Sequence, residues 1–553
     1  MNDDQNDSPF PQKILWCDSD IGALKEIGKG EGNLTEEQLK EVLRRYNLRD
    51  GLIALGQVSN LAFNNNGKYR VGRSAFRDSN TGVFVTEFAL AYLANVLIAS
   101  GANDYKSKQI NNKQNLLTLL NIYSNDLVAP ELVRDRSVTF THKDMLSTMV
   151  RMHFEQFEYQ FDYLHLVARN LIIFNEIIDL VIPRKFESLK IIFERETGLT
   201  FQHYFFLVMA VWAVSQKTAT FRKEALTEAI IPSMQSSLTD EKVTNFLNIL
   251  SADYKTFREV DNNANMNMES VFTKYRFNPL LIYPVIKTDK GSTDPYVIPN
   301  TLSFFKRGFG GLYWWFHRHF EIDNTHKNFR DYFGEVFEMY VGRILKQAYG
   351  TANVHPEIIY SKDKKKFIDW WVEHKSTIYL FEVKSYQFAL PTKQTGDLEL
   401  ILKEVKSKII ESIEQVYKRM SEIEKYDELA IFRGRKIVPL IVFMEIPLIS
   451  GQLYKEMIAE ELEHLEKNGL VGIKNAKIHL LNIEELELYT DVMDKIPLEE
   501  VFAKYENNLA DGFLSIIQKE IGKKPVNKYL DGVYKDFWKD MSGGTIPLEG
   551  DEK

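Results

Sequence analysis

Two β-rich segments joined by a short polar turn constrain the fold of this chain more than any other feature of its sequence. They read FIDWWV and TIYLFEVKS and lie between Phe367 and Ser385. Because side chains alternate between the two faces of a strand, Glu382 and Lys384 point the same way. The turn HKS predicts an antiparallel hairpin, which brings Asp369 of the first strand alongside Glu382 and Lys384 of the second.

Three charges among aromatic and β-branched neighbours cost several kcal/mol unless something compensates for them. Two carboxylates with a backbone carbonyl and waters provide the oxygen ligands that Mg²⁺ or Mn²⁺ prefers. A lysine beside such a cation suits phosphodiester hydrolysis, because it can orient or help to activate the attacking water. The alternative is a solvated edge of an ordinary sheet, with Lys384 paired to Glu382 or Asp369.

The surrounding pattern predicts an α/β sandwich of modest size. A helix from about Asn328 precedes three short β-rich segments, and a long helix over about 398–426 follows them. The run KIVPLIVFMEI suits a strand covered on both faces, with pairing that starts after Pro439. A helix near 453–467 and a strand near 477–481 complete the series. We therefore expect a mixed central sheet flanked by helices.

At this point the sequence resembles a known family. Asp369, twelve intervening residues and then Glu382-Val383-Lys384, each half on an expected strand, resemble the active-site motif of the PD-(D/E)XK nuclease superfamily, which has the restriction-endonuclease-like fold. The resemblance covers the C-terminal region only. It implies metal-dependent cleavage of nucleic acid, with Asp369 and Glu382 as metal ligands and Lys384 near the scissile phosphate. Ile368 stands where the name of the motif has proline, a position that varies widely in the superfamily.

Many members of that superfamily carry a further acidic residue on the helix before the sheet, and FRDYFGEVFEMYVGRIL offers Glu335 and Glu338. At about 100° per residue the apolar stripe of this helix faces the sheet, with Glu338 at its edge and Glu335 pointing into solvent. We expect Glu338 to be a catalytic residue and metal ligand. The alternative is a boundary glutamate in water or paired with a base.

Basic residues cluster around the expected site. They could form a local phosphate-binding patch, or they could be an ordinary solvated face. Gln415 lies on the same helix as several of them, where some members of the superfamily place a polar site residue. The basic residues are Lys362, Lys364, Lys365, Lys366, Lys403, Lys406, Lys408, Lys418 and Arg419.

The chain is too long for one ordinary core, so we expect several domains. Residues 1–285 predict a mainly helical regulatory or sensing region of one or two subdomains, with any break near 130. Residues 286–327 predict an aromatic connector with basic residues between the rings. It is either a surface on which bases stack or a packed aromatic helix whose charged groups reach into water. Residues 328–490 predict the nuclease-like domain, and residues 491–553 a helical extension and tail.

The composition indicates a reducing, cytoplasmic setting. The net charge of −8 provides no global attraction to nucleic acid, and the single cysteine, Cys17, excludes an intrachain disulfide framework. The acidic, polar N-terminus is unlike a signal peptide. The most apolar run, from Phe205 to Val214, is about half the length of a bilayer-spanning helix and predicts a buried helix. We expect no membrane association.

With the resemblance to the PD-(D/E)XK superfamily, these observations predict a Mg²⁺- or Mn²⁺-dependent endonuclease. DNA is favoured over RNA, and by analogy the architecture looks like that of bacterial defence or restriction effectors. A protein partner or self-association is expected through residues 1–285. Two alternatives stay open, namely a scaffold that has the nuclease fold without activity and a partner-binding protein whose function lies in residues 1–285.

Overall fold

The structure is a computed structural model. It describes residues 36–64, 69–73, 82–85, 87–103, 163–229, 238–265, 277–288, 293–322, 324–389, 392, 398–445, 452–507, 513–523 and 525–542. Cys17, the acidic N-terminus and the expected break near 130 lie outside these residues. In the described part the chain is largely helical, with several small sheets.

Two compact units divide the chain, and neither is continuous in sequence. Unit 1 comprises Met1–Val138, Trp212–Arg222 and Leu250–Phe304. Unit 2 comprises Thr139–Val211, Lys223–Ile249 and Phe305–Lys553. These boundaries differ from the ranges expected from sequence, and the regulatory, connector and nuclease-like domains stay a prediction.

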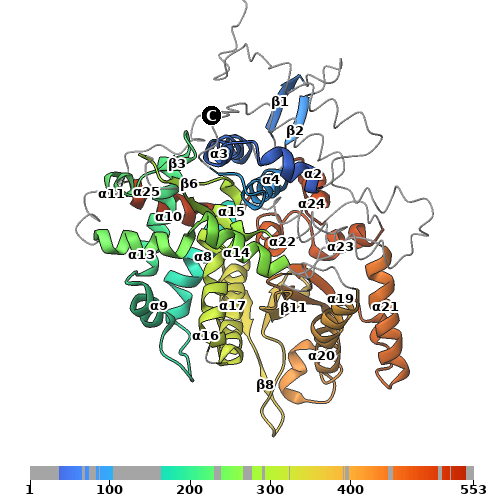
Figure 1. Ribbon diagram of the computed structural model, residues 1–553. Coiled ribbons are helices and arrows are strands. Elements are labelled where there is room, and N and C mark those ends of the chain that lie inside the picture. The colour runs from blue at the N-terminus through green and yellow to red at the C-terminus, as the bar shows by residue number, and fades with distance from the viewer. Residues whose placement is uncertain are drawn as a thin grey trace, which may run out of the picture. The chain divides into compact units, whose positions relative to one another are not determined.

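Unit 1 combines helices with short strands, which the mainly helical expectation for this part of the chain omitted (Figure 1). Strands β4 and β5 are parallel, and β5, β6 and β3 follow as antiparallel neighbours in one sheet. The elements of unit 1 are α2 (Glu36–Leu43), α3 (Leu48–Asn64), β1 (Tyr69–Arg73), β2 (Gly82–Val85), α4 (Glu87–Ala99), β3 (Thr220–Phe221), β4 (Ser251–Asp253), α14 (Tyr254–Asn265), η4 (Pro279–Leu281), β5 (Val285–Lys287) and β6 (Tyr296–Val297).

A buried carboxyl group lies in the core of unit 1. Ser59 Oγ and Asn300 Nδ2 donate hydrogen bonds of 2.7 and 2.6 Å to Glu87 Oε2. Its Oε1 is buried without a hydrogen-bond partner among the described residues. Burial raises the pKa of Glu87 from 4.5 to about 8, although the two hydrogen bonds act in the opposite direction. Glu87 is therefore mostly protonated at neutral pH.

Unit 2 contains the predicted site. Three helices pass from the residues of one unit into those of the other: α10 (Phe201–Ser215), α13 (Asp240–Leu250) and α15 (Thr301–Phe305). The remaining helices of unit 2 are α8 (Tyr163–Asn175), η2 (Ile177–Asp179), α9 (Leu189–Thr197), α11 (Lys223–Ala229), η5 (Lys306–Gly310), α16 (Gly311–Ile322), α17 (His326–Tyr349), η6 (Thr351–Asn353), α19 (Leu398–Glu404), η7 (Val405–Ile410), α20 (Glu411–Met420), η8 (Asp427–Phe432), α21 (Gln452–Lys467), η9 (Ile473–Asn475), α22 (Ile483–Tyr489), α23 (Leu498–Asn507), α24 (Phe513–Ile521) and α25 (Lys528–Ser542).

A five-stranded mixed sheet lies at the centre of unit 2, in the order β13-β12-β11-β10-β7. β7, β10 and β11 are antiparallel neighbours, whereas β11, β12 and β13 run parallel. This agrees with the expectation of a mixed sheet flanked by helices. The strands are β7 (Val354–Pro356), β10 (Trp370–His374), β11 (Thr377–Lys384), β12 (Lys436–Phe443) and β13 (His479–Asn482).

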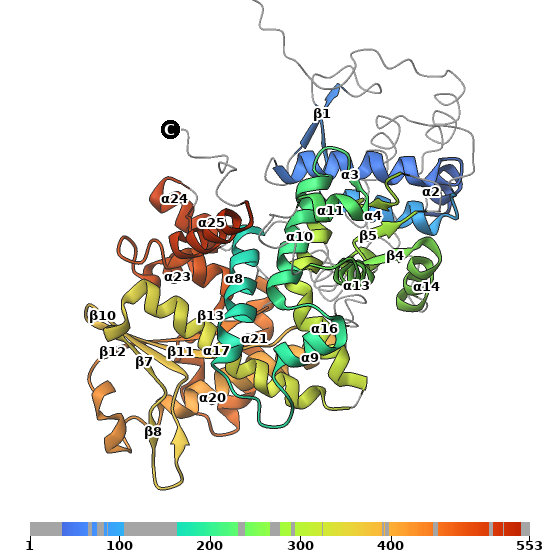
Figure 2. The same cartoon turned by 90° about the vertical axis from the view of Figure 1, so that its left-hand side faces the viewer.

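Helices cover both faces of this sheet (Figure 2). Ile378 and Leu380 of β11 belong to one apolar core with Ile409 and Val416 of the long helix that follows. On the opposite face the Trp370 ring lies against Gly342 of α17, where a Cβ atom would come within 2.2 Å of the ring. Glycine at position 342 is what allows α17 to approach the sheet so closely.

Pro439 does not delay pairing as far as we expected. β12 pairs with β11 over its whole length, with Pro439 opposite Leu380. Its pairing with β13 begins only at Leu440, after the proline. A proline lacks one N–H donor, so it interrupts hydrogen bonding towards one neighbour and leaves the other side paired. The expectation is confirmed for β13 and wrong for β11.

The basic run before Asp369 lies in a separate hairpin. β8 (Ile359–Tyr360) and β9 (Lys365–Lys366) pair antiparallel and project away from the central sheet (Figures 1 and 2). Tyr360 and Phe367 are buried at its base, whereas residues 362–366 are exposed. The segment KFIDWWV is therefore divided between two sheets.

The apolar and aromatic segments pack inside the protein. Residues 204–211 of α10 are all buried, as expected for the run that begins at Phe205. The rings of Phe305, Phe309 and Phe316 are also buried, which favours a packed helix over a stacking surface. In the described part of the chain no single helix is long and apolar enough to cross a membrane; the bent pair α9 and α10 passes by length and composition alone.

Candidate active site

The β10–β11 hairpin brings the predicted residues together. A two-residue turn joins the strands, with Lys375 at a φ of 55°, and the register pairs Trp370 with Phe381. Asp369 immediately precedes β10, and its Oδ2 accepts a hydrogen bond of 2.7 Å from the backbone N–H of Val383. Asp369 thus lies beside the segment Glu382-Val383-Lys384, as the alternation predicts.

Glu382 is a buried carboxylate held by two cations. Its side chain is only 2% exposed. Oε1 accepts a hydrogen bond of 2.7 Å from Lys384 Nζ, and Oε2 accepts one from the Arg419 guanidinium on α20. Lys384 Nζ also donates to Gln415 Oε1 at 3.0 Å. The negative charge of Glu382 is compensated inside the protein, which is the condition for burying it.

Glu338 lies near the same carboxylates. It is on α17, partly buried, and its backbone carbonyl accepts a hydrogen bond of 2.9 Å from Trp370 Nε1. Glu335, in contrast, has a side chain that is 49% exposed and forms an ion pair with Arg184 at 3.5 Å. The rotation of α17 about its axis agrees with the apolar stripe: Glu338 approaches the sheet and Glu335 points outward.

The carboxylates of the site disfavour one another's charge. Burial, then Asp369, Glu357 and Glu382, raise the pKa of Glu338 to about 8, with Lys366 acting in the opposite direction. Burial and then Glu382 raise the pKa of Asp369 to about 7, although the Val383 N–H and nearby cations oppose the shift. Such shifts are typical of sites where several carboxyl groups share a small volume.

The donors fit a hard divalent cation in kind. Among the described residues, one carboxylate oxygen of Asp369 has no hydrogen-bond partner, and the carboxylate of Glu338 accepts no hydrogen bond. Across the described ranges, however, no group of three or more His, Cys, Asp and Glu side chains is placed so as to hold a metal ion. Both oxygens of Glu382 are engaged by Lys384 and Arg419. As a ligand, Glu382 would have to share its oxygens between these two cations and the metal ion, or exchange one of the cations for the metal.

The basic residues that we expected to form a phosphate-binding patch divide into two groups. Lys362, Lys364 and Lys403 are exposed and have no ion-pair partner among the described residues. The others contact the protein itself: Lys365 pairs with Glu422, Lys366 with Glu357, Lys406 with Glu461, Lys418 with Glu414 and Arg419 with Glu382, while Lys408 lies 5.3 Å from the Tyr386 ring centre.

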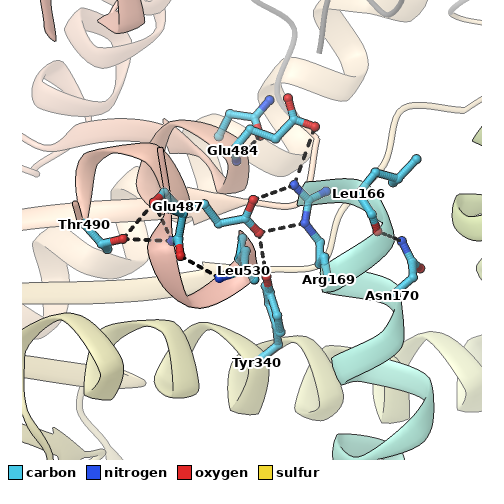
Figure 3. A network of polar contacts seen from close by, with 10 residues as sticks. Leu166, Arg169, Asn170, Tyr340, Glu484, Glu487, Thr490 and Leu530 are labelled. Atoms are coloured by element: carbon cyan, nitrogen blue, oxygen red, sulfur yellow. Dashed lines mark hydrogen bonds and ion pairs between the residues drawn. The ribbon is translucent and has the colours of Figure 1, made fainter. Parts of the chain in front are cut away.

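A buried network anchors α17, the helix that carries Glu338 (Figure 3). Arg169 of α8 donates two hydrogen bonds of 2.8 Å to Glu487 of α22, whose Oε1 also accepts one of 2.6 Å from Tyr340 Oη. Although burial favours the neutral form, the charge of Glu487 raises the pKa of Arg169 above its usual value. Tyr340 is two residues from Glu338, so this network fixes the helix that positions Glu338.

A capping box starts the helix that contributes Glu487. The Asn482 side chain accepts a hydrogen bond of 3.0 Å from the Glu484 N–H, and Glu485 accepts one of 2.9 Å from the Asn482 N–H. These bonds satisfy backbone donors at the first turn of α22. They set the first residues of the helix directly after β13 and so place Glu487 one turn further on.

Sequence reasoning missed two site features. Arg419 was grouped with the basic residues of an expected phosphate-binding patch or solvated face, whereas it contacts Glu382. It lies four residues after Gln415, and a spacing of four puts both side chains on one helix face, which was the available signal. Arg169 was not singled out, although an arginine inside the apolar helix HLVARNLIIF indicates a buried partner.

Comparisons with protein-family models, curated proteins and solved structures give no match for this chain.

Proposed function

We propose that this protein is a Mg²⁺- or Mn²⁺-dependent nuclease that hydrolyses phosphodiester bonds of nucleic acid, with DNA as the favoured substrate. The observation on which the proposal rests is the convergence of Asp369, Glu382 and Lys384 at one end of the β10–β11 hairpin. A helix before the sheet, a long helix after β11 and the mixed five-stranded sheet support a restriction-endonuclease-like core.

Each residue has a defined part in this proposal. Asp369, Glu382 and Glu338 would hold the cation, which when bound neutralises charge on the phosphate. Lys384, held in place by Gln415, would orient the attacking water at the scissile phosphate. The exposed lysines of the β8–β9 hairpin, Lys362 and Lys364, would contact the phosphate backbone. This hairpin projects from the sheet (Figure 1) and continues in sequence into Asp369, so it would extend the surface that contacts the substrate beyond the site itself.

The biological setting is part of the same proposal. A nuclease-like unit fused to a large further region is typical of bacterial defence or restriction effectors acting in the cytoplasm. In such an architecture residues 1–285 would sense a trigger, through a protein partner or through self-association. This part rests on analogy of architecture.

A second candidate function is a binding protein that has the nuclease fold without activity. The observation that favours it is the pairing of both Glu382 oxygens with cations of the chain, in a part of the structure where no three-carboxylate metal group is formed. Such a protein would bind nucleic acid or a protein partner and would not cut.

Cleavage assays separate the two candidates. The full chain is incubated with plasmid, linear DNA, single-stranded DNA and RNA in Mg²⁺, Mn²⁺ or EDTA. We expect metal-dependent cleavage that falls about a hundredfold or more in Asp369→Asn and Lys384→Gln, since each removes a group that acts at the reacting phosphate. Lys418→Gln on α20 is the matched control. Lys418 pairs with Glu414, so this substitution should leave the cleavage rate unchanged.

Cleavage by the Asp369→Asn, Lys384→Gln double variant at the parental rate would reject the active-site assignment. Tight binding of nucleic acid without cleavage in either metal would favour the scaffold. Circular dichroism and thermal unfolding of each variant exclude misfolding as the cause of a lost activity.

A further inference from the structure

Two cations hold the Glu382 carboxylate, one at each oxygen, and they are not equivalent. Lys384 Nζ has a second partner, Gln415 Oε1, at 3.0 Å. Arg419 makes its only hydrogen bond within the described residues to Glu382 Oε2. If Glu382 turns towards a metal ion, Lys384 keeps one hydrogen bond and Arg419 keeps none. Arg419 is therefore the partner whose side-chain hydrogen bonding within the described residues depends wholly on Glu382.

The Arg419 guanidinium has the properties of a fixed counter-ion. It stays charged at every physiological pH, and its planar group matches a carboxylate. Its side chain is 19% exposed, so after leaving Glu382 it can reach solvent without unfolding α20. With Lys384 it neutralises a glutamate that is 2% exposed, which explains how the site can fold around this residue before any metal is bound.

We infer that Arg419 is a built-in substitute for the metal, a positioning residue that occupies Glu382 in the metal-free protein and must leave it when Mg²⁺ or Mn²⁺ binds. This inference rests on the proposed function. It adds that the affinity of the site for metal is set by competition with a cation of the chain itself, so the metal-free site is folded and metal binding is weaker than the carboxylates alone would give.

Mn²⁺ binding to the full chain tests the inference without reference to activity. Calorimetric titration compares the parent with Arg419→Gln, Arg419→Lys and Lys418→Gln. Removing the competing ion pair should tighten Mn²⁺ binding by about tenfold or more, the value of one hydrogen bond to a charged group. Arg419→Lys keeps the charge, so its Mn²⁺ affinity should fall between that of the parent and that of Arg419→Gln. Lys418→Gln removes a neighbouring charge that faces Glu414 and should bind Mn²⁺ like the parent.

Thermal unfolding gives a second readout. In EDTA the Arg419→Gln protein should unfold at a lower temperature than the parent, because Glu382 keeps only Lys384. Saturating Mn²⁺ should raise its unfolding temperature by more than it raises that of the parent, since binding stabilises the folded state. An ion pair with a purely structural role would lower the unfolding temperature equally in both buffers and leave Mn²⁺ affinity unchanged; that outcome overturns the inference.

Asp369→Asn distinguishes failure of this inference from failure of the proposed function. If the parent binds Mn²⁺, Asp369→Asn abolishes binding and Arg419→Gln binds no more tightly than the parent, the inference is wrong and the metal site stands. If Mn²⁺ binds neither to the parent nor to Arg419→Gln, both the inference and the proposed metal site are rejected. If Arg419→Gln does not fold, Arg419→Lys decides: parental or weaker Mn²⁺ affinity rejects the competition.

Discussion

Asp369 is tied to the strand opposite it by a hydrogen bond of 2.7 Å, from the backbone N–H of Val383 to its Oδ2. Val383 is the residue between Glu382 and Lys384. The bond therefore fixes the Asp369 carboxylate relative to both neighbours through the backbone, which moves less than a side chain. It also leaves the second oxygen of Asp369 without a partner among the described residues.

The two glutamates of α17 provide a matched pair. We expect Glu338→Gln to weaken Mn²⁺ binding about tenfold or more and to reduce cleavage in parallel, because a neutral amide is a poorer ligand than a carboxylate for a hard cation. Glu335→Gln should change neither, since Glu335 is exposed and pairs with Arg184. Calorimetric titration and initial cleavage rates measure both effects. A larger loss in Glu335→Gln would mean that Glu335, not Glu338, faces the site.

The two interior glycines of α17 give a prediction about stability. In Gly342→Ala the new Cβ would lie 2.2 Å from the Trp370 ring, which is held by its 2.9 Å bond to Glu338 O. We expect a loss of about 1–3 kcal/mol, because the ring cannot move freely. Gly334→Ala has its nearest contact at 3.7 Å, so it should gain up to about 1 kcal/mol from helix propensity.

Thermal unfolding of both alanine variants, followed with the parent in one buffer, checks their opposite signs. Because Trp370 directly follows Asp369, Gly342→Ala should also weaken Mn²⁺ binding, whereas Gly334→Ala should leave it close to parental. Equal stability of the two variants would mean that α17 and β10 adjust to the added methyl group.

The β8–β9 hairpin predicts a salt dependence. Each phosphate contact contributes about 0.9 to the slope of log Kd against log salt concentration. We expect Lys362→Gln with Lys364→Gln to reduce that slope by about 2 for duplex DNA, measured by fluorescence anisotropy in the Asp369→Asn background so that the DNA stays intact. Lys327→Gln with Lys523→Gln, two exposed lysines elsewhere, is the control. An equal change in both double variants would mean that only net charge matters.

Glu87 predicts a pH dependence of the stability of unit 1. Its pKa rises from 4.5 to about 8 on folding. Between these values the unfolded chain loses a proton that the folded chain keeps, so stability falls as the pH rises from about 4.5 to about 8. Glu87→Gln lacks this penalty. The unfolding temperature of the variant minus that of the parent should increase as the pH rises across this range. Below pH 4 this difference should change little with pH.

The exposed Glu37→Gln, whose side chain pairs with Lys40 at the surface, is the control for the pH series. A gap between Glu87→Gln and the parent that is constant from pH 4 to pH 9 would show that the substitution acts through packing and not through the proton.

The local pattern of the sequence predicted the hairpin that carries the candidate site residues. Period-two alternation and the turn at Lys375 determine which side chains share a face and an end of the sheet. The apolar stripe of α17 likewise distinguished Glu338 from Glu335. These predictions succeeded because each depends on the geometry of one strand or one helix, and burial of the apolar face selects a single orientation.

What the sequence did not reveal depends on long-range packing. The contact of Arg419 with Glu382 requires α20 to lie over the end of β11, and no spacing in the sequence specifies that distance. Lys366 lies in β9 and Trp370 in β10, which belong to different sheets. This depends on where the chain leaves the central sheet. The two units interleave segments far apart in sequence, and a reading from one end to the other assigns such segments to consecutive domains.

The partners Arg169 and Glu487 are 318 residues apart in the chain. During synthesis Arg169 leaves the ribosome long before Glu487 exists, so its guanidinium lacks this partner while the chain between the two residues is being made. α17 is synthesised after Arg169 and before Glu487. Tyr340 of this helix also donates a hydrogen bond to Glu487, so it lacks the same partner until then. Contacts of such sequence separation form late and slowly. A nascent chain that stops anywhere before α22 lacks Glu487, so this anchor of the helix carrying Glu338 forms only after α22 has been made.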